Sequence, residues 1–250
     1  YLEISGVEYR EGLIKSRALY TSMERTGYFK CGNEDINKLY ENIIWGQKSN
    51  YVEVPTDCPQ RDERMGYTGD GHVFALTGAY NFNTDDFWRN WLKDLMLGQK
   101  DNSEGYIGST VPAQGKAGVG FLSMLGWGNA ISIIPKMMES VFGDEEILKE
   151  IYPSLKTFVE CEIKRMKDDL WISPSLGDWL SLNGSMAWAA MNNGPVSNSF
   201  IVNDLRVITE LSSRFGYEED YIRYNGQYKK TRDAWRRMWI TPDGTVASDY

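Results

Sequence analysis

Apolar residues recur at the spacing of an α-helix in successive segments along most of this 250-residue chain. Asn33 is suited to cap the first of these helices, and apolar side chains follow it at i, i+3, i+4, i+7 and i+8, namely Ile36, Leu39, Tyr40, Ile43 and Ile44. Because the helical segments do not alternate with strands and no heptad repeat persists, βαβ folds and coiled coils are disfavoured. Antiparallel helix pairs in a bundle, a solenoid or a toroid remain.

The same period predicts six further helical segments. They begin after Thr84, at Ala130, at Ile147, at Pro153, near Ser199 and near Glu218. Pro135 predicts a kink within the second of these, and Pro153 predicts the start of a new helix, since the first turn of a helix tolerates proline. Gly216 predicts the end of the helix that begins near Ser199.

Charge and composition limit the chemistry that this chain can perform. Asp and Glu number 35 against 27 Lys and Arg, for a net charge of -8, which argues against a nucleic-acid partner. No apolar run approaches the roughly 20 residues of a membrane span. His72 is the single histidine and the three cysteines lack CxxC spacing, so neither a multi-His zinc site nor another metal or cofactor site is indicated. The chemistry should therefore rest on carboxylates.

Two long connections interrupt the helical pattern. Residues 104–128 contain seven glycines, and residues 173–197 combine glycines and prolines with Trp179 and Trp188. Connections of this length inside a compact domain are more often functional than passive. The embedded tryptophans favour ordered, functional loops over disordered excursions.

A charged loop at residues 57–70 is the segment best suited to chemistry. It reads DCPQRDERMGYTGD, and six of these fourteen residues are charged. Pro59 fixes the backbone angle φ, and Gly66 permits a tight turn. We therefore expect a loop of defined shape rather than one face of a helix. The carboxyl group that is least paired and most desolvated should have a raised pKa, which is how a general acid is made.

The alternative interpretation of this loop is a surface segment in which Arg61 and Arg64 simply pair with Asp62 and Glu63. The aromatic residues elsewhere in the chain argue for a binding site instead. They include Tyr67, Trp127 and Trp179. Carboxylates beside aromatic rings suit sugars, whose hydroxyl groups form paired hydrogen bonds and whose apolar C–H faces stack on rings.

Residues 57–70 resemble the signature segment of the α-L-rhamnosidases of glycoside hydrolase family 78. The resemblance continues, in the family's order and approximate spacing, through residues 126–130, 152–156 and 177–180. It implies an all-α fold, an (α/α)6 toroid that is incomplete in this chain. It also implies that residues 1–24, with their weak strand-like pattern, end a preceding β-sandwich or linker, and that residues 25–250 form the N-terminal part of the catalytic domain.

The activity implied by the resemblance is that of an inverting glycosidase, which removes terminal α-linked L-rhamnose from oligosaccharides, polysaccharides or glycosides. In such a mechanism one carboxylic acid protonates the departing oxygen, while a second carboxylate activates water. Glu63 matches the family's general acid, and Asp57, Arg61 and Asp70 match residues that bind the rhamnose hydroxyls or hold the acid. The general base of the family lies further downstream, so we expect this piece alone to be inactive.

Several other positions carry over from the resemblance. Tyr67 stands where the family often has Trp, and we expect it to shape the sugar pocket. Trp127 and Trp179 match sugar-contacting aromatic residues, with Asp178 as a support for its neighbour, although packing alone would also explain such tryptophans. Asn129 stands where many relatives carry Asp, which argues against a charged role. We expect His72 to be a structural residue at a helix start.

Two other functions fit the same residues. A toroid without its base would bind carbohydrate without catalysis, and the same fold serves enzymes that act on other sugars. The intact proton-donor segment favours the hydrolase. The partner that the resemblance implies is a rhamnose-containing carbohydrate or glycoside, and no sequence feature indicates an oligomeric state or a compartment.

Overall fold

The computed structural model describes residues 3–62, 64–113, 120–180, 182 and 184–247. Within these residues the chain forms eight α-helices, two short helical turns and one hairpin of two-residue strands. In order they are α1 Glu34–Asn50, β1 Tyr51–Val52, β2 Val54–Pro55, α2 Thr68–Asn81, α3 Asp85–Lys100, η1 Gly120–Ser123, η2 Met124–Gly128, α4 Ala130–Phe142, α5 Glu145–Arg165, α6 Met186–Asn192, α7 Gly194–Phe215 and α8 Glu218–Trp239. The predicted all-α class is confirmed.

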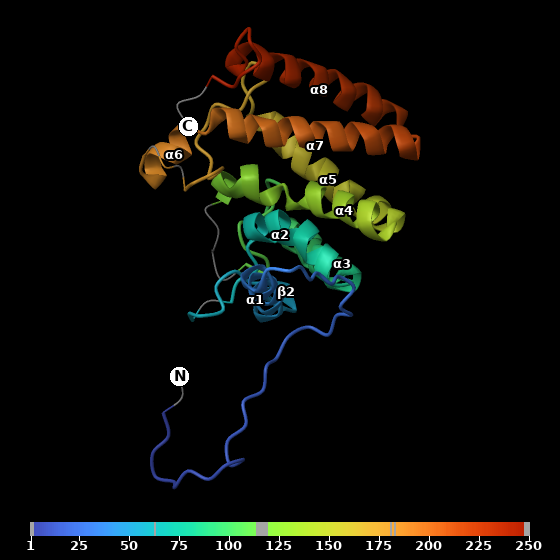
Figure 1. The fold of residues 1–250 in the computed structure, drawn as a ribbon. Coiled ribbons are helices and arrows are strands. Elements are labelled where there is room, and N and C mark those ends of the chain that lie inside the picture. The colour runs from blue at the N-terminus through green and yellow to red at the C-terminus, as the bar shows by residue number, and fades with distance from the viewer. Residues whose placement is uncertain (1–2, 63, 114–119, 181, 183, 248–250) are drawn as a thin grey trace.

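The long helices stack in chain order, from α1 at one end of the molecule to α7 and α8 at the other (Figure 1). Contacts between α2 and α4, α4 and α5, α5 and α7, and α7 and α8 join the layers. Gly143 and Gly216 end α4 and α7 with left-handed backbone, at φ 71° and 74°, as the glycine pattern predicted for the second of them. These sharp ends let each helix return directly along its neighbour.

The predicted apolar faces form the core of the molecule. On α3 one apolar face is fully buried; its members are Trp88, Trp91, Leu92 and Leu95. Asn33 caps α1 as predicted, since its side-chain oxygen accepts hydrogen bonds from the backbone N–H groups of the first turn. The apolar face of α1 is only partly covered, because Ile44 is 1% exposed but Leu39 is 58% exposed.

The prediction that a new helix starts at Pro153 is wrong, because α5 continues through this residue. Proline removes one intrahelical hydrogen bond. The residues on both sides of it pack into the same core, however; they are Ile147, Leu148, Ile151, Leu155, Phe158 and Val159. Burial of this continuous apolar face outweighs the lost bond. Similarly, α7 begins at Gly194 rather than near Ser199, with Pro195 in its first turn.

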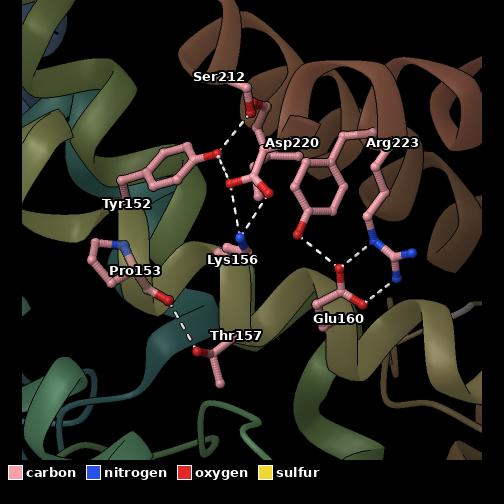
Figure 2. Close-up of polar contacts among 10 residues, drawn as sticks. Tyr152, Pro153, Lys156, Thr157, Glu160, Ser212, Asp220 and Arg223 are labelled. Carbon is pink, nitrogen blue, oxygen red and sulfur yellow. Dashed lines mark hydrogen bonds and ion pairs between the residues drawn. The ribbon is translucent and has the colours of Figure 1, made fainter. Parts of the chain in front are cut away.

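Polar contacts join α5 to α7 and α8 on the face shown in Figure 2. The ammonium of Lys156 lies 2.7 Å from Asp220 Oδ1, and the hydroxyl of Tyr152 donates to Asp220 Oδ2 at 2.9 Å. One turn further along α5, Glu160 accepts hydrogen bonds from Arg223 Nε and the hydroxyl of Tyr224, each at 2.7 Å. These bonds fix the register of the last helix against the centre of the molecule.

The N-terminal segment differs from the rest of the chain. Residues 3–24 form no helix or strand, and most of them extend away from the helices (Figure 1). The chain rejoins the helical layers where Thr21 N donates to Tyr51 O at 2.9 Å and Asn83 N donates to Glu24 O at 2.8 Å. The assignment of residues 1–24 to a preceding β-sandwich or linker, and of residues 25–250 to the catalytic domain, stays a prediction.

None of the helices in the described part of the chain combines the length and the apolar character that crossing a bilayer requires.

Candidate active site

The charged loop is closed at its base, because Thr56 and Gly66 form a β-bridge. Arg64 holds the interior of this loop: its Nη1 donates to the carbonyl of Cys58 at 2.9 Å, and its Nη2 donates to the carbonyl of Pro59 at 2.8 Å. The guanidinium group therefore shapes the backbone on which the carboxylates lie. Glu63, the predicted general acid, lies outside the described residues.

Asp57 opens this loop, and only one of its two carboxylate oxygens has a hydrogen-bond donor among the described residues. Its Oδ2 accepts a hydrogen bond from Cys58 Sγ at 3.2 Å. Its Oδ1 is buried and has no hydrogen-bond partner among the described residues. A buried carboxylate oxygen without a donor is costly, and a ligand hydroxyl would satisfy it. Arg61 is exposed in the same loop.

The start of α2 is anchored by pairing with a distant segment. Val111 N donates to Gly66 O at 2.8 Å, and Thr68 N donates to Ser109 O at 2.9 Å. These bonds fix the backbone on both sides of Tyr67, which is the N-cap residue of α2. Asp70 lies exposed in the first turn of the helix. A carboxylate is favoured there by the partial positive charge of the helix N-terminus.

Trp127 lies against the same turn of α2. It is 9% exposed, and its ring packs so closely on Gly69 that a Cβ atom there would lie 2.8 Å from it. Only glycine allows this approach. Tyr67 contacts Trp127 edge-on, with ring centroids 6.0 Å apart at 67°. The predicted aromatic residues at 67 and 127 are thus neighbours in space.

A cavity of about 310 Å³ unites four of the predicted site residues. Asp70 and Trp127 line it together with Asp178 and Trp179. Trp179 is 38% exposed, and Asp178 Oδ1 accepts a hydrogen bond from Leu180 N at 3.3 Å, which orders the turn that carries the tryptophan. The cavity thus combines two indole rings with two carboxylates.

A second cavity of about 370 Å³ adjoins the first through Asp70, which lines both. Its wall includes Asp57, Tyr51 and the side of α1 around Gln47. Asp70 therefore lines both the cavity that Asp57 of the charged loop lines and the cavity that the two tryptophans line. A bound sugar with one apolar face and several hydroxyl groups would match this combination.

Two further cavity residues were not identified as site residues from the sequence. His72 and Phe200 line the cavity with the tryptophans, and their rings meet edge-on with centroids 5.9 Å apart. Burial lowers the pKa of His72, which leaves the ring neutral. Helical periodicity could place Phe200 on one face of α7, but only the packing of α7 against η2 shows which face meets the cavity.

Comparisons with known proteins identify relatives of this chain. The family model described as the bacterial alpha-L-rhamnosidase 6 hairpin glycosidase domain matches residues 24–250. An α-L-rhamnosidase of Formosa agariphila is 32% identical over 96% of this chain and 26% of its own length. The chain spans between 23% and 27% of the length of three such relatives.

Solved structures share the arrangement of the helices. The Streptomyces avermitilis α-L-rhamnosidase complexed with L-rhamnose matches with a TM-score of 0.80 and 30% identity, over 91% of this chain and 21% of that structure. The native α-L-rhamnosidase of Aspergillus terreus matches with a TM-score of 0.79 and 33% identity, over 92% and 27%. The predicted toroidal fold class is confirmed, and this chain belongs to the family of bacterial α-L-rhamnosidase six-hairpin glycosidase domains.

Proposed function

We propose that the protein containing this chain is an inverting glycoside hydrolase that removes terminal α-L-rhamnose from oligosaccharides, polysaccharides or glycosides. The observation that carries the proposal is the cavity in which Asp70 and Asp178 meet Trp127 and Trp179. The structure of the Streptomyces avermitilis relative of this chain was solved in complex with L-rhamnose, which supports the same sugar as the substrate here. A cavity of about 310 Å³ is also at the lower end of the range expected for small-molecule sites.

The residues around the two adjoining cavities each have a part in the proposed binding of the sugar. Trp127 and Trp179 offer ring surface to the apolar face of rhamnose, including its methyl group. Asp70 and Asp57 accept hydrogen bonds from ring hydroxyls, and the buried Oδ1 of Asp57, which has no partner among the described residues, is the acceptor that most needs one. Arg61 of the charged loop binds a rhamnose hydroxyl or holds the general acid, as the family resemblance implies. Tyr67 packs edge-on against the ring of Trp127.

In the proposed mechanism Glu63 is the general acid. Its protonated carboxyl group donates a hydrogen to the glycosidic oxygen as the bond to the anomeric carbon breaks. A second carboxylate, about 6.5 to 9.5 Å away in inverting enzymes, removes a proton from the attacking water on the opposite face of the sugar. Following the family resemblance, we assign this base to a residue downstream of this chain.

The experiment that tests the proposal uses the protein expressed from its complete coding sequence. It is assayed on a panel of aryl glycosides that includes the α-L-rhamnoside, and the anomer released first is identified by proton NMR. We expect release of rhamnose as the inverted anomer. Binding without release would support a carbohydrate-binding protein, and release of another sugar alone would reassign the substrate.

A matched pair of tryptophan variants tests the cavity itself. Trp179→Ala should raise KM for the rhamnoside, because it removes a stacking surface. Trp45→Ala removes the same type of side chain from α1, where Trp45 is 53% exposed and contacts Lys48, and should leave KM unchanged. Equal effects of the two substitutions would remove Trp179 from the site.

A further inference from the structure

Two carboxylates without exposed surface lie behind the wall of the sugar cavity. Glu162 comes from α5 and Asp204 from α7. Asp204 accepts hydrogen bonds from Ser132 Oγ and, at 2.6 Å, from Asn129 Nδ2. The same Asn129 Nδ2 lies 3.4 Å from Glu162 Oε1. We call these four residues, Asn129, Ser132, Glu162 and Asp204, the buried carboxylate cluster.

Burial favours the protonated forms of the two carboxyl groups of the cluster. Burial raises the pKa of Glu162, and the neighbouring charge of Asp204 raises it further; burial also raises the pKa of Asp204. Glu162 Oε2 has no donor among the described residues, and a proton on this oxygen would let Glu162 donate to Asp204, the carboxylate with which it interacts. Cys161, the other titratable group that interacts with the pair, has its pKa raised by burial to about 11 and is uncharged at neutral pH.

Asn129 connects the cluster to the cavity wall. Its amide nitrogen donates to the carboxylates, while its Oδ1 accepts a hydrogen bond from Gly126 N at 2.6 Å. An aspartate at this position could not donate and would add a third buried carboxylate. As long as position 204 carries a carboxylate, the contacts on both ends of the Asn129 side chain therefore require an amide.

Gly126 is held from two further directions. Its carbonyl oxygen lies 2.9 Å from His72 Nε2, and the carbonyl of its neighbour Leu125 accepts a hydrogen bond from Gly177 N at 3.2 Å. The backbone of Gly126 is in the left-handed region, at φ 83°. The next residue is Trp127, so the direction of this turn sets the position of its indole ring.

We propose that Asn129 and Asp204 are positioning residues of the sugar cavity: through the amide of Gly126 they hold the turn that places Trp127 at the cavity wall. This inference rests on the proposed function for its effect on sugar binding. Neither side chain lines the cavity, so both act through the turn rather than on the sugar.

Isosteric substitutions separate this role from simple packing. Asp204→Asn removes an acceptor and sets an amide donor against Ser132 or Asn129. We expect residues 125–127 to lose protection from hydrogen exchange, and L-rhamnose to bind about tenfold more weakly, as the loss of one buried hydrogen bond implies. Glu162→Gln keeps a donor toward Asp204 and an acceptor toward Asn129, so we expect protection and affinity close to those of the unmodified protein.

The decisive variant exchanges the two side chains. Asn129→Asp combined with Asp204→Asn keeps the bonds to Gly126, to Ser132 and between positions 129 and 204, and we expect it to restore both protection and affinity. All variants are made in the protein expressed from its complete coding sequence. Hydrogen exchange is followed by mass spectrometry and L-rhamnose binding by calorimetry.

The outcomes distinguish this inference from the proposed function. If Asp204→Asn exposes the turn but leaves L-rhamnose affinity unchanged, or if the exchanged pair folds without protecting the turn, the positioning role is overturned. Should Asp204→Asn fail to fold, the exchanged pair decides alone, and failure of that pair to fold would also contradict the inference. If the unmodified protein binds no L-rhamnose, the proposed function fails, while hydrogen exchange still decides whether the cluster holds the turn.

Discussion

His72 Nε2 lies 2.9 Å from the carbonyl oxygen of Gly126, which joins helix α2 to the turn that carries Trp127. The same helix carries Asp70. This one contact therefore connects the element that places a carboxylate at the cavity wall to the turn that places an indole ring there. Because a carbonyl oxygen can only accept, Nε2 carries the hydrogen and donates it, and the neutral ring suffices for this bond. This agrees with the structural role expected of His72.

The contact predicts how stability depends on pH. Burial lowers the pKa of His72 below the value of 6.5 that it has when exposed, so the unfolded chain binds this proton more readily. The contribution of His72 is fully present above pH 6.5 and is lost as pH falls through the folded-state pKa. His72→Gln should reduce the loss of stability on acidification in this range, measured by urea unfolding. An unchanged pH profile would show that folding does not lower the pKa of His72.

Close packing at Gly69 predicts a second result. Gly69→Ala would force a methyl group to within 2.8 Å of the Trp127 ring. We expect a loss of about 1 to 3 kcal/mol in unfolding free energy, together with weaker L-rhamnose binding. The matched control is Gly98→Ala on α3, where nothing lies within 4 Å of the added atom. That change should be neutral or stabilise by up to about 1 kcal/mol, and equal destabilisation by both would contradict the packing argument.

The contacts between α5 and α8 predict a further pH effect (Figure 2). Hydrogen bonds from Arg223 lower the pKa of Glu160 below 4.5, in spite of partial burial and with help from Tyr224. The stability contributed by this carboxylate is therefore present above pH 4.5 and lost as pH falls through the folded-state pKa. Glu160→Gln should be less stable than the unmodified protein at neutral pH, and the difference should shrink in acid. A difference that stays constant with pH would show that the charge contributes nothing.

The buried carboxylate cluster predicts the opposite dependence. The pKa of Glu162 is raised above 4.5 and that of Asp204 to about 7, both chiefly by burial, so the folded state retains protons that the unfolded chain releases. The stability linked to these protons is fully present below pH 3.8 for Asp204 and below pH 4.5 for Glu162, and it is lost as pH rises through the folded-state pKa values. Glu162→Gln should flatten the fall in stability between pH 4.5 and 7, measured by urea unfolding. An equally steep fall in the variant would show that Glu162 is not the group that retains a proton in the folded state.

Helical periodicity alone predicts much of this fold, because each long helix buries one apolar face. The face of α3 around Trp88 and Trp91 follows directly from its spacing. Periodicity fails where tertiary packing opposes a local rule: α5 passes through Pro153 because the core continues on both sides of it. It also fails at α7, where Gly194 and Pro195 were assigned to a loop but form the first turn of the helix.

The residues that line the candidate site could be predicted from the sequence, but the residues that hold them in place could not. The resemblance to a known family singled out Asp70, Trp127, Asp178 and Trp179, and these line one cavity. The residues that hold the cavity wall in place could not be found in this way. Asn129 and Asp204 are far apart in the chain, and their contact depends on how α4, α5 and α7 pack together.

The most direct measurement of the central claim compares two neighbouring carboxylates of the charged loop. Glu63→Gln and Asp62→Asn are made in the protein expressed from its complete coding sequence, and kcat/KM is measured on rhamnosides with poor and with activated leaving groups. We predict that Glu63→Gln loses about 10² to 10⁴-fold of the activity on poor leaving groups and much less on activated ones, because an activated group departs without a proton. Asp62→Asn should stay near the unmodified value. An active Glu63→Gln variant, or a loss independent of the leaving group, would contradict the assignment of Glu63 as proton donor.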